Sequence, residues 1–247
     1  MPSKPEIQVQ ADAGALFQAA AKEVVRLAKA AVKGSGRFTV ALAGGSTPKS
    51  MYSLLASGSV LGIPWDKTYV FFADERHVPP DHAESNFRMA NETLLSKVPL
   101  AADHIFRMPA EIPDPDTAAL SYEQTLRQFF ALKEEEMPRF DLILLGMGPD
   151  GHTASLFPGT AALRDNENLV AANWVEKFKT WRITFTYPVL NHAAHVIFMV
   201  TGAEKADALF AILRGEHDPE TYPAQRVKPT KGRVLWLVDS AAAAKIT

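Results

Sequence analysis

The densest group of residues able to do chemistry lies in one run, Gly146–Pro158, which reads GMGPDGHTASLFP. Asp150 and His152 stand two positions apart in it. The ordinary pKa of a histidine, about 6.5, suits proton transfer near neutral pH. We therefore expect His152 to act as a general base, with Asp150 either holding its ring in one tautomer or fixing the loop. Taken alone, the run also fits a glycine-rich turn with an incidental surface histidine.

A second group, Gly44, Gly45, Ser46 and Thr47, follows a short apolar run at 38–43. Paired glycines and hydroxyls at the start of a helix leave backbone N–H groups free, and such groups suit a phosphate or sugar oxygens. The spacing and the missing lysine exclude a Walker loop, and the dinucleotide fingerprint is absent as well. A tight turn with a Ser/Thr cap is the alternative interpretation.

Two charged residues, Asp74 and Arg76, come directly after the apolar run 69–73. They must lie at the rim of a sheet, because burying unpaired charges is costly. Arg76 offers a rigid fork of donors for phosphate or carboxylate. Asp74 could orient Arg76 or bind a substrate hydroxyl, and a purely structural ion pair between them is the alternative.

Two further cations follow other apolar runs. Arg182 lies in the β-type run 181–187, and Lys205 opens a helix just after the run 195–200. The helix dipole disfavours a lysine in the first turn, so an anionic partner would explain Lys205. Each could also be an ordinary surface cation. Together with the glycine loop and Arg76, they favour a phosphorylated small molecule as ligand.

The elements that must position these residues alternate along the chain. Strand patterns occur at 38–43, 69–73, 140–145, near 169–170, at 181–187, 195–200 and 234–238. Helix patterns occur at 11–32, 46–56, 86–98, 116–136 and 204–213, and an alanine-rich helix is expected at the C-terminus. This alternation predicts βαβ units, a mostly parallel sheet and right-handed crossovers. No linker or repeat interrupts it, so we expect a single domain over 1–247.

Composition excludes several classes of protein. The 247 residues contain no cysteine, which removes disulfides, thiol nucleophiles and cysteine-bound metal. The net charge is −2 and no basic block is present, which argues against a nucleic-acid partner. No apolar run reaches the roughly 18 residues needed to span a membrane, and residues 1–10 lack a signal core. A soluble cytoplasmic protein is expected.

Six motifs in fixed order resemble the 6-phosphogluconolactonase family. They are LAGGSTP at 42–48, ADERHV at 73–78, SN at 85–86, the 146–158 run, GAEK at 202–205 and YPAQRV at 222–227. The resemblance implies an α/β, Rossmann-like fold, with a mostly parallel sheet flanked by helices, shared with glucosamine-6-phosphate deaminases, ribose-5-phosphate isomerases and CoA transferases. It also implies hydrolysis of 6-phosphoglucono-δ-lactone to 6-phosphogluconate in the oxidative pentose phosphate pathway, with no metal or organic cofactor. For a chain of this size we expect a monomer or homodimer.

The expected mechanism uses His152 as the base that activates water, with a glycine-loop N–H or a cation at the oxyanion. Arg182, Lys205 and Arg76 would hold the 6-phosphate, and which of them serves the oxyanion instead is left open. The nearest alternative is an amino-sugar-phosphate deaminase or isomerase. Deaminases carry Asp-Glu-Tyr where this chain has Asp-Glu-Arg at 74–76, and a glutamate at the position of Phe157, which cannot assist ring opening. A non-catalytic sugar-phosphate sensor of the same fold would need a DNA-binding segment, for which neither end of the chain offers room.

Overall fold

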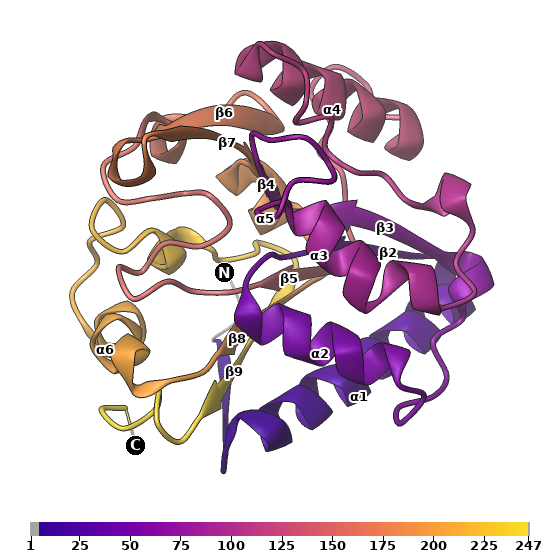
Figure 1. Cartoon of the computed structure of the whole chain (residues 1–247). Helices are drawn as coiled ribbons and strands as arrows, with labels where there is room; N and C mark the ends of the chain where they lie inside the picture. Colours follow the sequence, from indigo (N-terminus) through magenta and orange to yellow (C-terminus); the bar gives the residue numbers. More distant parts are fainter. Residues whose placement is uncertain (1–4, 247) are drawn as a thin grey trace.

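A six-stranded parallel sheet forms the centre of the computed structural model, which describes residues 5–246 (Figure 1). In spatial order its strands are β1 (Glu6–Gln10), β9 (Arg233–Asp239), β8 (His195–Val200), β5 (Leu142–Leu145), β2 (Phe38–Leu42) and β3 (Thr68–Phe72). All neighbouring pairs run parallel. The predicted α/β architecture with a mostly parallel sheet is therefore confirmed. The edge strand β1 was not predicted.

The direction of chain progression reverses between β2 and β5. From β2 the chain passes outward to β3, whereas β5, β8 and β9 follow one another on the other side of β2. Open α/β sheets bind ligands at such a switch point, in the crevice beyond the carboxyl ends of the strands. The two glycine-containing loops at 43–45 and 146–148 start at this point.

Helices cover both sides of the sheet (Figure 1). They are α1 (Ala13–Ser35), α2 (Ser46–Ala56), α3 (Asn86–Thr93), α4 (Pro115–Phe130), α5 (Tyr187–His192) and α6 (Ala206–Arg214). The Asp12 side chain caps α1 by accepting from the N–H of Ala15, and Gly36, with a φ of 79°, ends it. Helices α1 and α2 pack against each other and the main sheet, whereas α4 packs against a second sheet. Within residues 5–246, no helix has the length and apolar character needed to cross a membrane.

The second sheet is antiparallel and was not predicted. It consists of β4 (Asp74–Arg76), β7 (Thr180–Phe185) and β6 (Val170–Val175), with β7 in the middle. The register places Arg76 opposite Arg182, and Asp74 opposite Thr184. Three consecutive charged residues do not look like a strand in sequence, and this pairing depends on a partner more than 100 positions away. The second sheet therefore places Arg182 next to Arg76.

Two predicted helices are shorter than expected, and one is absent. Helix α4 ends at Phe130 because Ala131 turns into the left-handed region, with a φ of 51°, so 131–136 is not helical. Helix α3 ends at Thr93, before a short 3₁₀ turn. The expected C-terminal helix is wrong, since 240–246 forms turns. The Asp239 carboxylate accepts from the N–H of Ala242, and this bond closes a turn directly after β9.

A buried carboxylate fixes the connection between β4 and α3. The side chain of Glu75 is 2 % exposed and accepts four hydrogen bonds. The donors are the N–H groups of Arg76, Asn86 and Phe87 and the Ser85 hydroxyl, at 2.7–3.0 Å. Burial raises the pKa of Glu75, and the backbone N–H groups counteract part of that rise. The Glu75 carboxylate therefore holds the backbone of Arg76, at the end of β4, against the first residues of α3.

We predict that Glu75→Gln lowers the free energy of unfolding by about 2 kcal/mol, because an amide NH₂ cannot accept and would face two donors without a partner. The measurement is urea unfolding at neutral pH. Glu92→Gln is the matched control, since Glu92 lies exposed on α3 and pairs only with Arg88. Its unfolding free energy should change by less than about 0.5 kcal/mol. Equal losses in the two variants would contradict the anchoring role of Glu75.

Candidate active site

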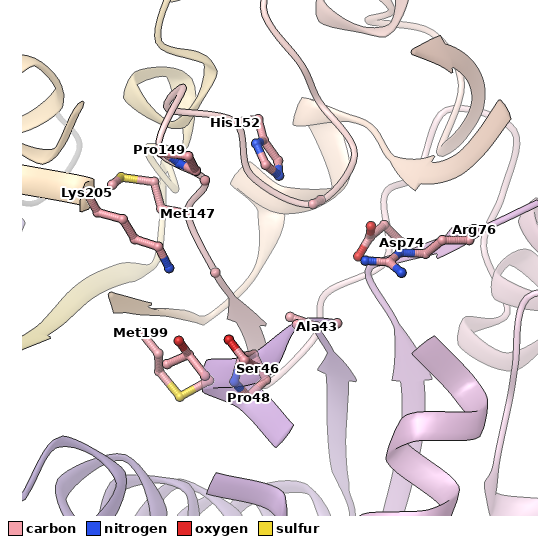
Figure 2. A pocket seen from close by; sticks show the side chains of 16 residues that line it. Ala43, Ser46, Pro48, Asp74, Arg76, Met147, Pro149, His152, Met199 and Lys205 are labelled. Atoms are coloured by element: carbon pink, nitrogen blue, oxygen red, sulfur yellow. The ribbon is translucent and has the colours of Figure 1, made fainter. Parts of the chain in front are cut away.

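A pocket of about 210 Å³ opens at the switch point (Figure 2). All of the predicted site residues line it except Asp150 and Arg182. The lining ones are Gly44, Gly45, Ser46, Thr47, Asp74, Arg76, His152 and Lys205. They come from the carboxyl ends of four different strands, β2, β3, β5 and β8, or from the segments directly after them. The parallel topology thus brings together residues that lie up to 161 positions apart in the sequence.

Asp150 contacts His152 directly. Its Oδ1 lies 2.5 Å from Nδ1 of the imidazole, and its Oδ2 lies 3.0 Å from the Lys177 ammonium. Partial burial favours the neutral acid, but the hydrogen bonds and charges of His152 and Lys177 outweigh it and hold the pKa of Asp150 well below its ordinary value. An ionised carboxylate can only accept, so a neutral His152 must carry its proton on Nδ1. That tautomer leaves Nε2 with a free lone pair.

Close packing fixes the plane of the His152 ring. One face stacks on Phe157, with ring centroids 4.0 Å apart and planes inclined by 20°. Gly148 lies so near the ring that an added Cβ would come within 2.1 Å of Nδ1 and Cε1. The Gly148 N–H also donates to the His152 carbonyl at 2.9 Å. A side chain at position 148 would therefore displace the imidazole.

Hydroxyl groups tie the His152 loop to both sheets. The Thr153 hydroxyl donates to the Gly146 carbonyl at 2.9 Å. The Ser155 hydroxyl donates to Oδ2 of Asp74 at 2.7 Å, and the Ser155 N–H donates to the Thr184 hydroxyl at 3.2 Å. Asp74 itself is only 7 % exposed. It therefore joins β4 to the loop that carries the histidine, in addition to lining the pocket.

The glycine loop presents backbone donors at the start of α2. Gly45 precedes the helix with a φ of 102°, a conformation that glycine adopts readily. Gly44 packs against Asn86, whose Oδ1 would lie 1.9 Å from an added Cβ. Within residues 5–246, the N–H groups of Ser46 and Thr47 meet no backbone or side-chain acceptor. Free N–H groups at a helix N-terminus are suited to an anion.

Lys205 and Arg76 lie on opposite sides of the pocket, with His152 between them in the view of Figure 2. Lys205 ends a 3₁₀ turn, Ala203–Lys205, directly before α6. Burial lowers the pKa of Lys205, although Glu204 and Asp239 act in the opposite direction. In the described part of the chain its ammonium has no hydrogen-bond or ion-pair partner. A half-buried cation without a partner favours an anionic ligand.

Arg182 lies opposite Arg76 on the neighbouring strand β7 and is not one of the residues that line the pocket. It is 8 % exposed, and burial together with the charge of Arg76 lowers its pKa. Arg76 donates to the Glu84 carbonyl at 2.8 Å, yet the buried Nε atoms of both arginines lack an acceptor among residues 5–246. The Arg182 guanidinium lies over the Phe178 ring, 5.5 Å from its centroid. Direct contact between Arg182 and a ligand stays a prediction.

Some residues at the site gave no signal in the sequence. Lys177 reaches Asp150 from the tip of the β6–β7 hairpin, which was not predicted. Met147 and Met199 line the pocket but look like ordinary core residues. His77 lies outside the pocket, with Nε2 at 2.8 Å from the Ile112 carbonyl oxygen. Residues 5–246 contain no group of three or more His, Cys, Asp or Glu side chains arranged to hold a metal.

Comparisons with known proteins agree on one family. Residues 11–236 match the family model described as glucosamine-6-phosphate isomerases/6-phosphogluconolactonase. A 6-phosphogluconolactonase from Nostoc is 42 % identical over 99 % of each chain, and one from Synechocystis is 41 % identical over 96 % of this chain and 97 % of its own. The solved structure of 6-phosphogluconolactonase from Trypanosoma cruzi superposes with a TM-score of 0.88, at 31 % identity, over 100 % of this chain and 98 % of that one.

A monomeric glucosamine-6-phosphate deaminase has the same fold, with a TM-score of 0.81 at 19 % identity. It covers 97 % of this chain and 99 % of its own. At that identity the likeness concerns the fold alone, whereas the lactonase relatives share far more of the sequence. The chain belongs to the glucosamine-6-phosphate isomerase/6-phosphogluconolactonase family.

Proposed function

We propose that this enzyme hydrolyses 6-phosphoglucono-δ-lactone to 6-phosphogluconate, with His152 as the general base. The observation that carries the proposal is the Asp150–His152 pair, which leaves the imidazole Nε2 free in a pocket flanked by cations. The family match and the names of the lactonase relatives support the choice of substrate.

The proposed reaction begins with a water molecule between His152 and the lactone carbonyl carbon, C1. Nε2 takes a proton from the water as its oxygen bonds to C1, and the carbonyl oxygen becomes an oxyanion. The oxyanion then re-forms the carbonyl as the C1–ring oxygen bond breaks, and the imidazolium returns the proton to the departing ring oxygen. The carboxylic acid formed at C1 ionises to give 6-phosphogluconate. Asp150 stabilises the imidazolium between these steps, because its carboxylate already accepts from Nδ1. General-base assistance of this kind typically contributes about 10²–10⁴-fold to the rate.

We place the phosphate at the Lys205 side of the pocket. The N–H groups of Ser46 and Thr47 and the ammonium of Lys205 have no partner within residues 5–246, and they are donors of the kind that hold phosphate oxygens. Arg76, on the opposite side, would then face the sugar ring and the developing oxyanion, with Arg182 adding positive charge from the neighbouring strand β7. Binding the distant phosphate would position C1 against His152.

The stacked Phe157 ring favours lactone hydrolysis over deamination. It covers one face of the His152 imidazole, and it stands at the position where the resemblance gives deaminases a glutamate. A phenyl ring cannot move the protons that opening an amino-sugar ring requires. Lactone hydrolysis needs only one activated water and a stabilised oxyanion.

We predict that His152→Ala lowers kcat at least about 100-fold with little change in KM, because only proton transfer is lost. A pH-stat assay on freshly made 6-phosphoglucono-δ-lactone measures this, after subtraction of spontaneous hydrolysis. His77→Gln, outside the pocket, should keep the wild-type kcat. Near-normal turnover by His152→Ala would contradict the base assignment, and ammonia release from glucosamine-6-phosphate by the wild type would favour a deaminase.

Lys205→Met should raise KM for the phosphorylated lactone at least about tenfold, because a charge-assisted hydrogen bond to phosphate is lost. The same variant should hydrolyse unphosphorylated glucono-δ-lactone at nearly the wild-type kcat/KM. Lys49→Met removes an exposed charge from α2 without touching the pocket and serves as control. Equal losses on both lactones would argue against a phosphate role for Lys205.

Gly148→Ala should lower kcat by at least about tenfold while the protein stays folded. The added methyl group must displace the His152 ring, and a shift of about 1 Å at a reacting group costs on the order of 100-fold. Kinetics and thermal unfolding should be measured together. Gly34→Ala, where an added Cβ meets nothing within 4 Å, controls for the loss of a glycine. Wild-type kcat in Gly148→Ala would refute the packing argument.

A further inference from the structure

We propose that the dipeptide Lys177–Phe178, at the tip of the β6–β7 hairpin, is a positioning element for the Asp150–His152 pair. Both side chains act through other residues and need not touch the substrate. Lys177 contacts the Asp150 carboxylate, and Phe178 contacts Phe157, whose ring stacks on the His152 imidazole. The inference rests on the proposed function, because it concerns the orientation of the proposed base.

Lys177 fixes the rotation of the Asp150 carboxylate. Oδ1 lies 2.5 Å from the imidazole Nδ1 and also accepts from the His152 backbone N–H at 3.4 Å, whereas Oδ2 lies 3.0 Å from the Lys177 ammonium. Without Lys177, both of these partners belong to His152, and the carboxylate could offer them either oxygen. With Lys177 on Oδ2, Oδ1 stays in line with the imidazole. Carboxylates that orient a catalytic histidine require such a fixed geometry.

Phe178 supports the other side of the histidine. It meets Phe157 edge-on, with centroids 5.7 Å apart and planes at 77°, and Phe157 stacks on His152 at 4.0 Å. Phe157 is 6 % exposed, whereas Phe178 is 48 % exposed. An exposed phenyl ring thus closes the outer edge of an aromatic stack that ends at the imidazole. The same ring lies under the Arg182 guanidinium.

A pair of tryptophans holds the hairpin together behind its tip. Trp174 and Trp181 pair across the strands with centroids 5.5 Å apart, and the Trp174 indole donates to Glu176 at 2.8 Å. Lys179 turns the chain with a backbone φ of 50°, and its side chain forms only a solvent-exposed ion pair with Glu176, which adds little to the stability of the hairpin. Lys177 and Lys179 therefore stand two residues apart with different partners. Of these two lysines, Lys177 is the one that contacts the Asp150–His152 pair.

The first test compares Lys177→Gln with Lys179→Gln, which removes the same charge from the same hairpin. Exposed ion pairs are weak, so we expect kcat to fall about two- to fivefold in Lys177→Gln, with KM for 6-phosphoglucono-δ-lactone unchanged. Lys177→Arg should restore most of the loss, and Lys179→Gln should match the wild type. Phe178→Ala should lower kcat by a similar factor, and Phe178→Leu by less. Unchanged kcat in Lys177→Gln, or a rise in its KM alone, would overturn the proposal.

A double-mutant cycle separates positioning from a general loss of charge. If Lys177 acts through Asp150, then Lys177→Gln should have no further effect on kcat in an Asp150→Asn background. A full additional loss in that background would show that Lys177 acts elsewhere.

A readout without turnover keeps this inference separate from the proposed function. Nitrogen-15 NMR of the histidine rings, with His152 assigned from the spectrum of His152→Gln, reports the Nδ1–H tautomer. Lys177→Gln should shift or broaden the His152 signals, and Lys179→Gln should leave them as in the wild type. Lack of lactone hydrolysis by the wild type would refute the proposed function alone, whereas identical His152 signals in all variants would refute the positioning role.

Discussion

The hydrogen bond between the Asp150 carboxylate and the His152 imidazole is the interaction that orders the candidate active site. It determines which ring nitrogen of a neutral His152 carries the proton, and hence which one keeps a lone pair. Three neighbouring residues hold the imidazole and the carboxylate in this arrangement. Gly148 leaves space for the ring, Phe157 covers one face of it, and Lys177 occupies the second carboxylate oxygen. A histidine at the same place without these neighbours could adopt either tautomer and several orientations.

The topology of the main sheet explains why such distant residues meet. Because chain progression reverses between β2 and β5, the loops after these strands diverge and leave a crevice at their carboxyl ends. The glycine loop enters this crevice from β2 and the histidine loop from β5. The antiparallel sheet then closes one side through Asp74, which receives a hydrogen bond from Ser155 of the histidine loop. The parallel sheet thus supplies the two loops that line the pocket, and the antiparallel sheet binds the histidine loop from one side.

Local patterns in the sequence predicted the parts of the site that depend on local structure. The 46–56 helix and the 195–200 strand were predicted with their observed bounds, and the glycine loop and His152 follow strands whose apolar runs are unmistakable. The antiparallel sheet escaped because its pairing joins segments far apart in sequence, and β4 consists of charged residues. The place of Arg182 opposite Arg76 and the reach of Lys177 depend on that pairing. The prediction of a C-terminal helix was wrong for another reason, since alanine content does not reveal that the Asp239 side chain closes a turn with Ala242 directly after β9.

The paired guanidinium groups of Arg76 and Arg182 have a consequence for the free enzyme. Two positive charges stand on adjacent strands, and their buried Nε atoms lack acceptors within residues 5–246. The charge of Arg76 opposes that of Arg182, whereas Asp74, Glu84 and Glu75 offset part of this repulsion. An anion bound beside Arg76 would reduce it further. Anion binding and folding stability are then thermodynamically linked, because an anion that binds the native state beside Arg76 and Arg182 favours that state over the unfolded chain.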